Sequence, residues 1–156
     1  MPYLADTNVV TRRVLPADAQ HTLARTAIDR LLSRGETVYA TAQILVEFRA
    51  LATRPLAANG LGLTPEDASL RAQMIEAIFP LLPEVPSVYN NWRRLADTYR
   101  IVGRQVFDTR LVAVMLAHGV THILTLDARH FQRFAAEGII VVEPHEVHDI
   151  EEVNDE

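Results

Sequence analysis

The stretch QVFDTRLVAVMLAHGVTHILTL, residues 105–126, decides the fold that this sequence predicts. Its first half carries apolar side chains at helical spacing and ends at His118 and Gly119, where glycine favours a helix stop. Its second half, HILTL at residues 122–126, is short and apolar, as expected for a buried strand. The chain is therefore predicted to pass from a helix over about residues 106–118 directly into a strand.

The same alternation of helices and apolar strands runs outward from this stretch to both ends of the chain. Strands are expected at residues 3–5, 37–40, 122–126 and 139–142, and helices after Asn8, at 20–34, after Thr41, and at 65–79, 87–100 and 106–118. Residues 80–86 hold three prolines and are interpreted as a connection. Leu70, Met74 and Ile78 are interpreted as a core-facing stripe, part of which could instead seat a dimer mate or a partner helix. Such alternation predicts a three-layer α/β/α fold with a mostly parallel central sheet.

Length and composition are those of a globular protein with one core. The chain has 156 residues, 49% of them hydrophobic and 22% charged, which predicts one domain over residues 1–148 and an acidic, frayed tail at 149–156. No apolar run approaches the roughly 20 residues that a membrane span requires, so no membrane association is expected. The absence of cysteine and of a signal-like N-terminus favours a cytoplasmic location.

Charge does not decide whether the partner is a nucleic acid. The formal net charge is −5, which argues against phosphate binding, yet all 15 basic residues are arginine, the side chain best suited to bidentate phosphate contacts. Genomic base composition is the simpler explanation of an all-arginine chain. Other features must therefore indicate the function.

Four acids far apart in the sequence are predicted to meet at one edge of the sheet. Asp6 and Asp127 each follow an apolar strand, and Asp108 opens a helix, so all three belong at the carboxyl ends of the strands, where open α/β sheets bind ligands. Glu47 lies about two turns into a helix, inside the apolar segment ILVEF. An acid in such a segment is costly to bury without a partner or a cation.

Each acid taken alone also has a structural explanation. Asp108 and Asp127 suit helix caps worth about 1 kcal/mol each, Asp6 suits a turn, and Glu47 suits an ion pair with a distant arginine. Gathered at one edge, however, like charges repel unless a cation holds them. Carboxylates without cysteine or histidine ligands favour Mg²⁺ or Mn²⁺, and such a centre predicts phosphodiester hydrolysis.

Four segments stand in order along the chain: LADTNVV (4–10), ILVEFRA (44–50), GRQVFDTRLVAVMLAHGVTHILTLDARHFQRF (103–134) and IIVVEP (139–144). Through them nearly the whole chain resembles PIN-domain nucleases, most closely the VapC-type toxins of bacterial toxin–antitoxin pairs. The resemblance implies a doubly wound α/β/α fold and cleavage of RNA with Mg²⁺ or Mn²⁺ held by Asp6, Glu47, Asp108 and Asp127. It also implies frequent homodimers and inhibition by a small cognate antitoxin.

The resemblance assigns the acids unequal roles. Asp6 and Asp108 are expected to be direct or water-bridged metal ligands, and Asp127 an outer member of the cluster. Glu47 is expected to be a ligand or a base that orients the attacking water.

Five further residues are candidates to support the acids or to contact RNA. Thr7, Asn8 and Thr125 are placed to hydrogen-bond ligands or water. Arg49 and Arg110 stand beside acids in the sequence and are candidate RNA contacts, although pairing with an acid is the commoner role of such an arginine. The histidines between residues 118 and 130 show no metal-site spacing and are expected at the surface or as helix caps.

Two other functions remain open from the sequence. A PIN-like module that binds RNA or protein without cleavage would share the fold. An aspartate-nucleophile phosphatase also places an acid after the first strand, but it usually carries a second acid two residues later, where this chain has Asn8.

Overall fold

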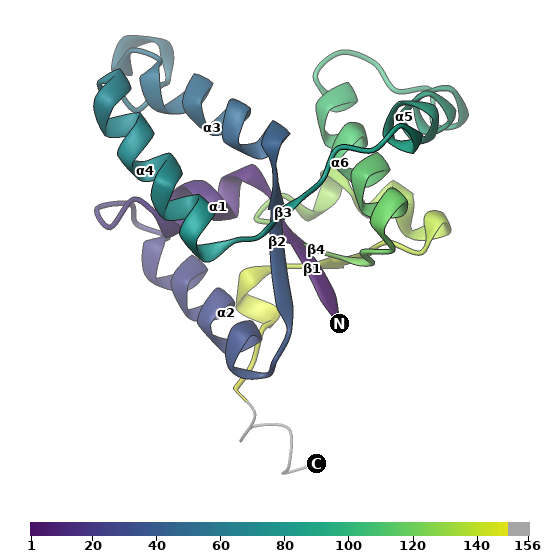
Figure 1. Ribbon diagram of the computed structural model, residues 1–156, viewed down its shortest axis with the longest axis horizontal. Helices are drawn as coiled ribbons and strands as arrows, with labels where there is room; N and C mark the ends of the chain where they lie inside the picture. Colours follow the sequence, from purple (N-terminus) through teal and green to yellow (C-terminus); the bar gives the residue numbers. More distant parts are fainter. Residues whose placement is uncertain (150–156) are drawn as a thin grey trace.

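The computed structural model describes residues 1–149, in which five parallel strands form a single sheet (Figure 1). The strands are β1 (Pro2–Ala5), β2 (Thr37–Thr41), β3 (Leu81–Leu82), β4 (His122–Leu124) and β5 (Ile140–Val142). Their order across the sheet is β3-β2-β1-β4-β5. The frayed tail predicted at 149–156 lies outside the described residues except for Asp149, which stands 3.8 Å from Arg30.

Helices cover both faces of this sheet. They are α1 (Thr7–Arg13), α2 (His21–Ser33), α3 (Ala42–Thr53), α4 (Pro65–Ile78), α5 (Ser87–Thr98) and α6 (Gln105–His118). Figure 1 shows α1 to α4 on one side of the sheet and α5 and α6 on the other. The predicted three-layer α/β/α fold is confirmed. No helix in residues 1–149 is long and apolar enough to cross a membrane.

The strand order reverses between β1 and β4. From β1 the chain winds outward through β2 to β3, then returns across the sheet by α5 and α6 to place β4 on the other side of β1. Ala5 pairs with Leu124, so the two strands end level with each other. Open parallel sheets bind ligands at such a reversal, beyond the carboxyl ends of the strands. Residues that directly follow β1 and β4 are therefore the first candidates for a site.

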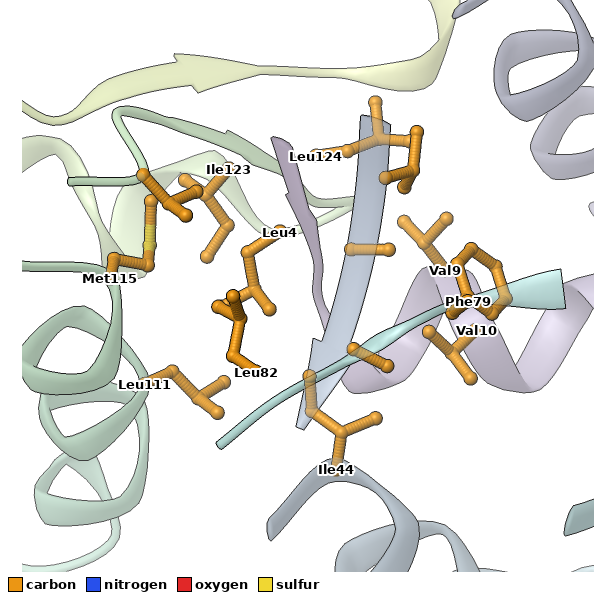
Figure 2. Packing of buried hydrophobic residues seen from close by; sticks show 14 of the residues in the cluster. Leu4, Val9, Val10, Ile44, Phe79, Leu82, Leu111, Met115, Ile123 and Leu124 are labelled. Atoms are coloured by element: carbon orange, nitrogen blue, oxygen red, sulfur yellow. The ribbon is translucent and has the colours of Figure 1, made fainter. Parts of the chain in front are cut away.

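The core fixes how α1 and α6 approach this edge. In Figure 2 the side chains of Leu111 and Met115 on α6 lie on one side of β1, and those of Val9 and Val10 on α1 lie on the other. These four side chains and Leu4 of β1 are fully buried. Because both helices pack on the same strand, their N-terminal ends are held beside its carboxyl end.

Strand β3 was not predicted, because it lies in the proline-rich connection. It has two residues, of which Leu81 pairs with Ala40 and Leu82 with Thr41. The carbonyl of Pro80 also accepts a hydrogen bond from the Ala40 N–H at 3.0 Å. Proline has no N–H to donate to a neighbouring strand, so it is tolerated beside a short strand at the sheet edge.

The predicted core stripe on α4 is wrong for Leu70 and Met74, whereas Ile78 packs against the core. Leu70 is 60% exposed and Met74 40% exposed, whereas Ala68 and Ile75 are the buried residues of this helix. The physical reason is that α4 packs against α3 rather than on the sheet. A narrow contact through Ala68 and Ile75 is enough for packing on α3 and leaves Leu70 and Met74 exposed.

Candidate active site

All four predicted acids line one hollow at the carboxyl edge of the sheet. Asp6 lies between β1 and α1, Glu47 on α3, Asp108 in the first turn of α6, and Asp127 three residues after β4. The hollow has a volume of about 470 Å³, and we call it the acid pocket. The fold therefore brings together side chains that are up to 121 positions apart in the sequence, the separation of Asp6 and Asp127.

Asp6 is the most buried of the acids and is held by three hydrogen bonds. Its side chain is the N-cap of α1 and accepts from the Thr7 backbone N–H at 2.7 Å. The Thr125 hydroxyl donates to its other carboxylate oxygen at 2.9 Å, and the Asn8 amide donates to the same oxygen at 3.3 Å. The three predicted supporting residues thus all contact this cluster. Asn8 stands where an aspartate-nucleophile phosphatase would carry its second acid, and here it donates a hydrogen bond to Asp6.

Glu47 is held by two neutral donors. The Thr7 hydroxyl donates to one carboxylate oxygen at 2.6 Å, and the Gln43 amide donates to the other at 3.0 Å. Thr7 therefore joins two acids, because its backbone N–H binds Asp6 and its hydroxyl binds Glu47. These contacts explain how an acid in the middle of a mostly apolar helix is accommodated.

His130 lies between the two remaining acids. Its Nδ1 is 3.0 Å from an Asp108 carboxylate oxygen, and its Nε2 is 3.2 Å from an Asp127 carboxylate oxygen. The prediction of surface or cap histidines missed this contact, although His130 stands three residues after Asp127. It is also wrong for His122, which is 6% exposed at the start of β4 and packs 4.8 Å from the Tyr3 ring.

Asp127 does not act as a side-chain helix cap. The turn that follows it has no cap hydrogen bond from its carboxylate. Its backbone N–H instead donates to the Thr125 hydroxyl at 3.0 Å, the same hydroxyl that donates to Asp6. The carboxylate is thereby left to face the acid pocket and His130.

The acids raise one another's proton affinity. Burial raises the pKa of Asp6 to about 7, with the negative charges of Asp108 and Glu47 adding to the effect and hydrogen bonds opposing it. Burial likewise raises the pKa of Asp108, and the charges of Glu47 and Asp127 raise it further, while His130 acts in the opposite direction. The pocket thus holds more negative charge than its surroundings compensate, which a cation would relieve.

The donor set fits a hard, hydrated divalent cation. Carboxylate oxygens are the ligands preferred by Mg²⁺ and Mn²⁺, and Mg²⁺ usually keeps several of its waters. The four acids do not form a closed cage of protein ligands. Within residues 1–149, ligand atoms of three acids or histidines approach within 4.8 Å of one another only at Glu143, His145 and Glu146, a group at a different place with two exposed members. The wider spacing of the pocket acids suits an ion that retains water.

The raised pKa of Asp6 leads to a prediction about stability. The usual pKa of an aspartate is 3.8, and that of Asp6 in the folded protein is about 7. At pH values between these two, Asp6 keeps its proton in the folded protein and loses it in the unfolded chain. The free energy of unfolding therefore falls as pH rises through this window. The penalty is complete above pH 7. Without divalent ions, Asp6→Asn is therefore expected to be more stable than wild type at pH 8, on the order of 4 kcal/mol, and equally stable below pH 4. Urea unfolding at the two pH values measures the difference.

Thr109→Val provides no such gain and controls for general effects of substitution near the pocket, since within residues 1–149 the Thr109 hydroxyl bonds only to the Gln105 carbonyl. A destabilised Asp6→Asn protein at pH 8 in EDTA would contradict the inferred repulsion. Saturating Mg²⁺ is expected to reverse the order, because only the wild-type carboxylate binds the ion.

Neither arginine predicted to contact RNA lines the acid pocket. Arg110 donates to both carboxylate oxygens of Glu84, at 2.8 and 3.2 Å, and to the Gln43 side chain at 2.8 Å. Arg49 donates to the Ser69 hydroxyl at 3.0 Å, on the outer surface between α3 and α4. Arg110 is therefore paired with an acid, whereas Arg49 contacts a neutral hydroxyl.

Three other arginines line the acid pocket and were missed. They are Arg12, Arg54 and Arg104. Helical periodicity, rather than adjacency in the sequence, identifies two of them: Arg104 precedes Asp108 by four residues, and Arg54 follows Glu47 by seven. Residues at these spacings lie on the same face of a helix, whereas neighbouring residues do not.

Fold and pocket together define an α/β protein with a carboxylate-lined site at the switch point of its parallel sheet, the place between β1 and β4 where the strand order reverses. The chain belongs to the PIN-domain family, whose model matches residues 3–137. It is 30% identical over 142 residues to ribonuclease VapC48 of Mycobacterium tuberculosis, which covers 89% of this chain and 94% of the relative.

Solved structures share the fold at lower sequence identity. VapBC2 from Rickettsia felis, bound to a DNA fragment from its promoter, aligns with a TM-score of 0.65 and 12% identity over 92% of this chain and 98% of that one. FitAcB from Neisseria gonorrhoeae aligns with a TM-score of 0.59 and 23% identity over 92% of this chain and 98% of that one. At these identities the similarity establishes the common architecture.

Proposed function

We propose that this protein is a Mg²⁺- or Mn²⁺-dependent endoribonuclease and the toxin of a bacterial toxin–antitoxin pair, acting in the cytoplasm. The observation that carries the proposal is the meeting of Asp6, Glu47, Asp108 and Asp127 in one pocket at the switch point of the sheet. The ribonuclease relative and the match to the PIN-domain model support the RNA-cleaving part.

The chain's own residues divide the work of hydrolysis. Asp6 and Asp108 would hold the cation, which when bound supplies an acidified water and neutralises charge on the phosphodiester. Glu47, fixed by Thr7 and Gln43, is placed to orient the attacking water and accept its proton. Asp127 restrains the Asp108 carboxylate through His130, which contacts both acids.

The proposed partners are RNA, a cognate antitoxin and a second copy of this chain. The structural neighbours from Rickettsia felis and Neisseria gonorrhoeae, VapBC2 and FitAcB, are toxin–antitoxin complexes, which supports the antitoxin. The exposed apolar side chains on α4, Leu70 and Met74, provide surface for a protein contact. A short reading frame directly upstream that encodes a DNA-binding segment would support the biological role.

Metal dependence is the direct test of the proposed activity. The purified protein is expected to cleave single-stranded RNA with Mg²⁺ or Mn²⁺, to lose this activity in EDTA, and to regain it when either ion is restored. Binding to the folded state alone also stabilises it, by about 2.7 kcal/mol at a hundredfold excess over Kd. The melting temperature of wild type should therefore rise with Mg²⁺, whereas that of Asp108→Asn should rise much less.

Two results would contradict the proposal. Cleavage that persists in EDTA would show that the acids do not work through a cation. RNA that is retained in a gel-shift assay but never cleaved, with either metal, would favour the non-catalytic binding module.

A further inference from the structure

We propose that Phe107, Arg54 and Arg104 form a subsite for single-stranded RNA at the rim of the acid pocket. In this subsite the phenyl ring stacks on an unpaired base, and the two guanidinium groups bind phosphates on either side of it. The inference rests on the proposed RNA-cleaving function and specifies how its substrate is held.

The position of Phe107 carries the first part of the argument. The side chain is 56% exposed, although it immediately precedes Asp108. Single exposed apolar residues are common, so exposure alone indicates nothing. Phe107, however, lines the acid pocket and also a second hollow of about 470 Å³, whose walls include Gln43 and Val46 of α3. An aromatic ring therefore stands at the junction between the acids and an adjoining, mostly apolar surface.

A hydrogen bond fixes this ring's backbone relative to the acids. The Gln43 amide nitrogen donates to the Phe107 carbonyl at 2.8 Å. The same nitrogen donates to the Glu47 carboxylate at 3.0 Å. Because one amide binds both residues, the backbone of Phe107 is tied to the Glu47 carboxylate. A nucleobase stacked on Phe107 would thus place its phosphate near Glu47 without a rearrangement of the protein backbone.

The two arginines differ from the others near the site in being unpaired. Among residues 1–149, the side chains of Arg54 and Arg104 have no hydrogen-bond or ion-pair partner, although both line a pocket with four acids. Arg110, by contrast, is engaged by Glu84. A guanidinium group that is free beside an acid pocket is available for a phosphate, to which it binds bidentately.

The position of Arg54 is set by the loop that follows it. Gly62 donates its backbone N–H to the Arg54 carbonyl at 2.9 Å, so the loop turns back onto the end of α3. A Cβ on Gly60 would lie 2.0 Å from that same carbonyl oxygen, which excludes any larger residue there. The loop therefore requires glycine at this point to hold Arg54 beside the pocket.

The chemistry of the subsite selects unpaired RNA. Arg104, Phe107 and Asp108 all stand at the N-terminal end of α6, so base, phosphate and acid contacts would fall within one helical turn. Bases inside a duplex are stacked on their neighbours and have no free face for an aromatic side chain. A ring beside the acids therefore favours loops, ends or other single-stranded segments as substrate.

Binding of a ten-nucleotide, fluorescein-labelled single-stranded RNA tests the inference. Fluorescence anisotropy is measured with Mg²⁺ in an Asp108→Asn background, which prevents cleavage. Adding Phe107→Ala is expected to weaken binding about tenfold, the usual value of one base–aromatic stack. Phe107→Trp should retain the affinity, whereas Phe107→Leu should lose it, because leucine is apolar but cannot stack. Val102→Ala is the matched control, since Val102 is 75% exposed and lines neither hollow.

An abasic scan of the same RNA tests stacking itself. One abasic nucleotide is placed at each position in turn. At one position, removal of the nucleobase should weaken RNA binding about tenfold in the protein that has Phe107. The same abasic RNA should bind the Phe107→Ala protein as tightly as the intact RNA does, because the ring and the nucleobase act as a pair. An unchanged penalty in both proteins at every position would overturn the stack.

Salt dependence tests the arginines. Arg54→Ala and Arg104→Ala should each lower the slope of log Kd against log salt concentration by about one, as expected for the loss of one phosphate contact. The lysine substitutions at the same positions should preserve the slope. Unchanged slopes in both alanine variants would show that phosphate does not bind there.

The outcomes separate this inference from the proposed function. If wild type cleaves RNA while Phe107→Ala binds the decamer normally, the subsite is wrong and the nuclease stands. If Phe107→Ala instead converts a dimer to a monomer in light scattering with RNA affinity unchanged, the ring serves a contact between copies and the inference is overturned. If wild type neither binds nor cleaves RNA, the proposed function itself fails.

Discussion

Asp108→Asn is expected to lower the rate of RNA cleavage by about three orders of magnitude and to leave the protein folded. Loss of a ligand that holds a divalent ion removes several kcal/mol of transition-state stabilisation. Asparagine keeps the shape of the side chain but brings no charge to balance the ion. Because the charges of Glu47 and Asp127 oppose ionisation of Asp108, the substitution also relieves repulsion. Single-turnover cleavage at saturating Mg²⁺, with urea unfolding of the same sample, measures both effects.

Asp97→Asn is the matched control for this substitution. Asp97 is exposed on α5 and does not line the acid pocket, so the same chemical change there should leave cleavage unaltered. Near-normal cleavage by the Asp108→Asn protein would remove this acid from the proposed mechanism. A loss of activity matched by a loss of folded protein would attribute the effect to stability instead.

The acids were predictable because their placement follows from local rules. Asp6 directly follows an apolar strand, and Asp108 lies in the first turn of a helix, so each is placed by short-range pattern alone. In a parallel sheet all carboxyl ends lie at one edge, and local placement therefore becomes a shared position. Thr125 was predictable for the same reason, since it follows β4.

The residues that were missed depend on how distant segments meet. His130 reaches Asp108, 22 residues away, only because the turn after β4 lies against the N-terminal end of α6. Arg110 has an acid beside it in sequence, yet its partner is Glu84, which the unpredicted strand β3 brings near. Adjacency in the sequence was therefore misleading for charged side chains, whose partners are chosen by tertiary packing.

Glu47 shows where sequence and structure each contribute. Its mid-helix position in an apolar segment indicated a special environment, and an ion pair with a distant arginine remained open. The structure provides two neutral donors instead, Thr7 and Gln43. A carboxylate held by neutral groups keeps its charge available, as a group that accepts a proton from water requires.

Phe48→Ala is expected to destabilise the protein by about 3 to 5 kcal/mol, the usual cost of removing a buried aromatic ring and leaving a cavity. Phe48 is fully buried on α3 and lies in the core with Ile44 and Ala52. Because domains of this size are stable by only about 5 to 15 kcal/mol, the variant loses a large part of its stability. Urea unfolding monitored by circular dichroism measures the change.

Val46→Ala on the same helix is its matched control and should alter stability by no more than about 0.5 kcal/mol, since Val46 is 70% exposed. Phe48 also anchors the turn of α3 that carries Glu47. At a temperature where the Phe48→Ala protein is still folded, it should therefore cleave RNA more slowly than wild type. A cost below about 1 kcal/mol would mean that α3 is not packed on the core as described. The position of Glu47 beside Asp6 would then lack its support from the core, because hydrogen bonds such as those from Thr7 to Glu47 and from Gln43 to Phe107 would have to hold the helix against repulsion between the two acids.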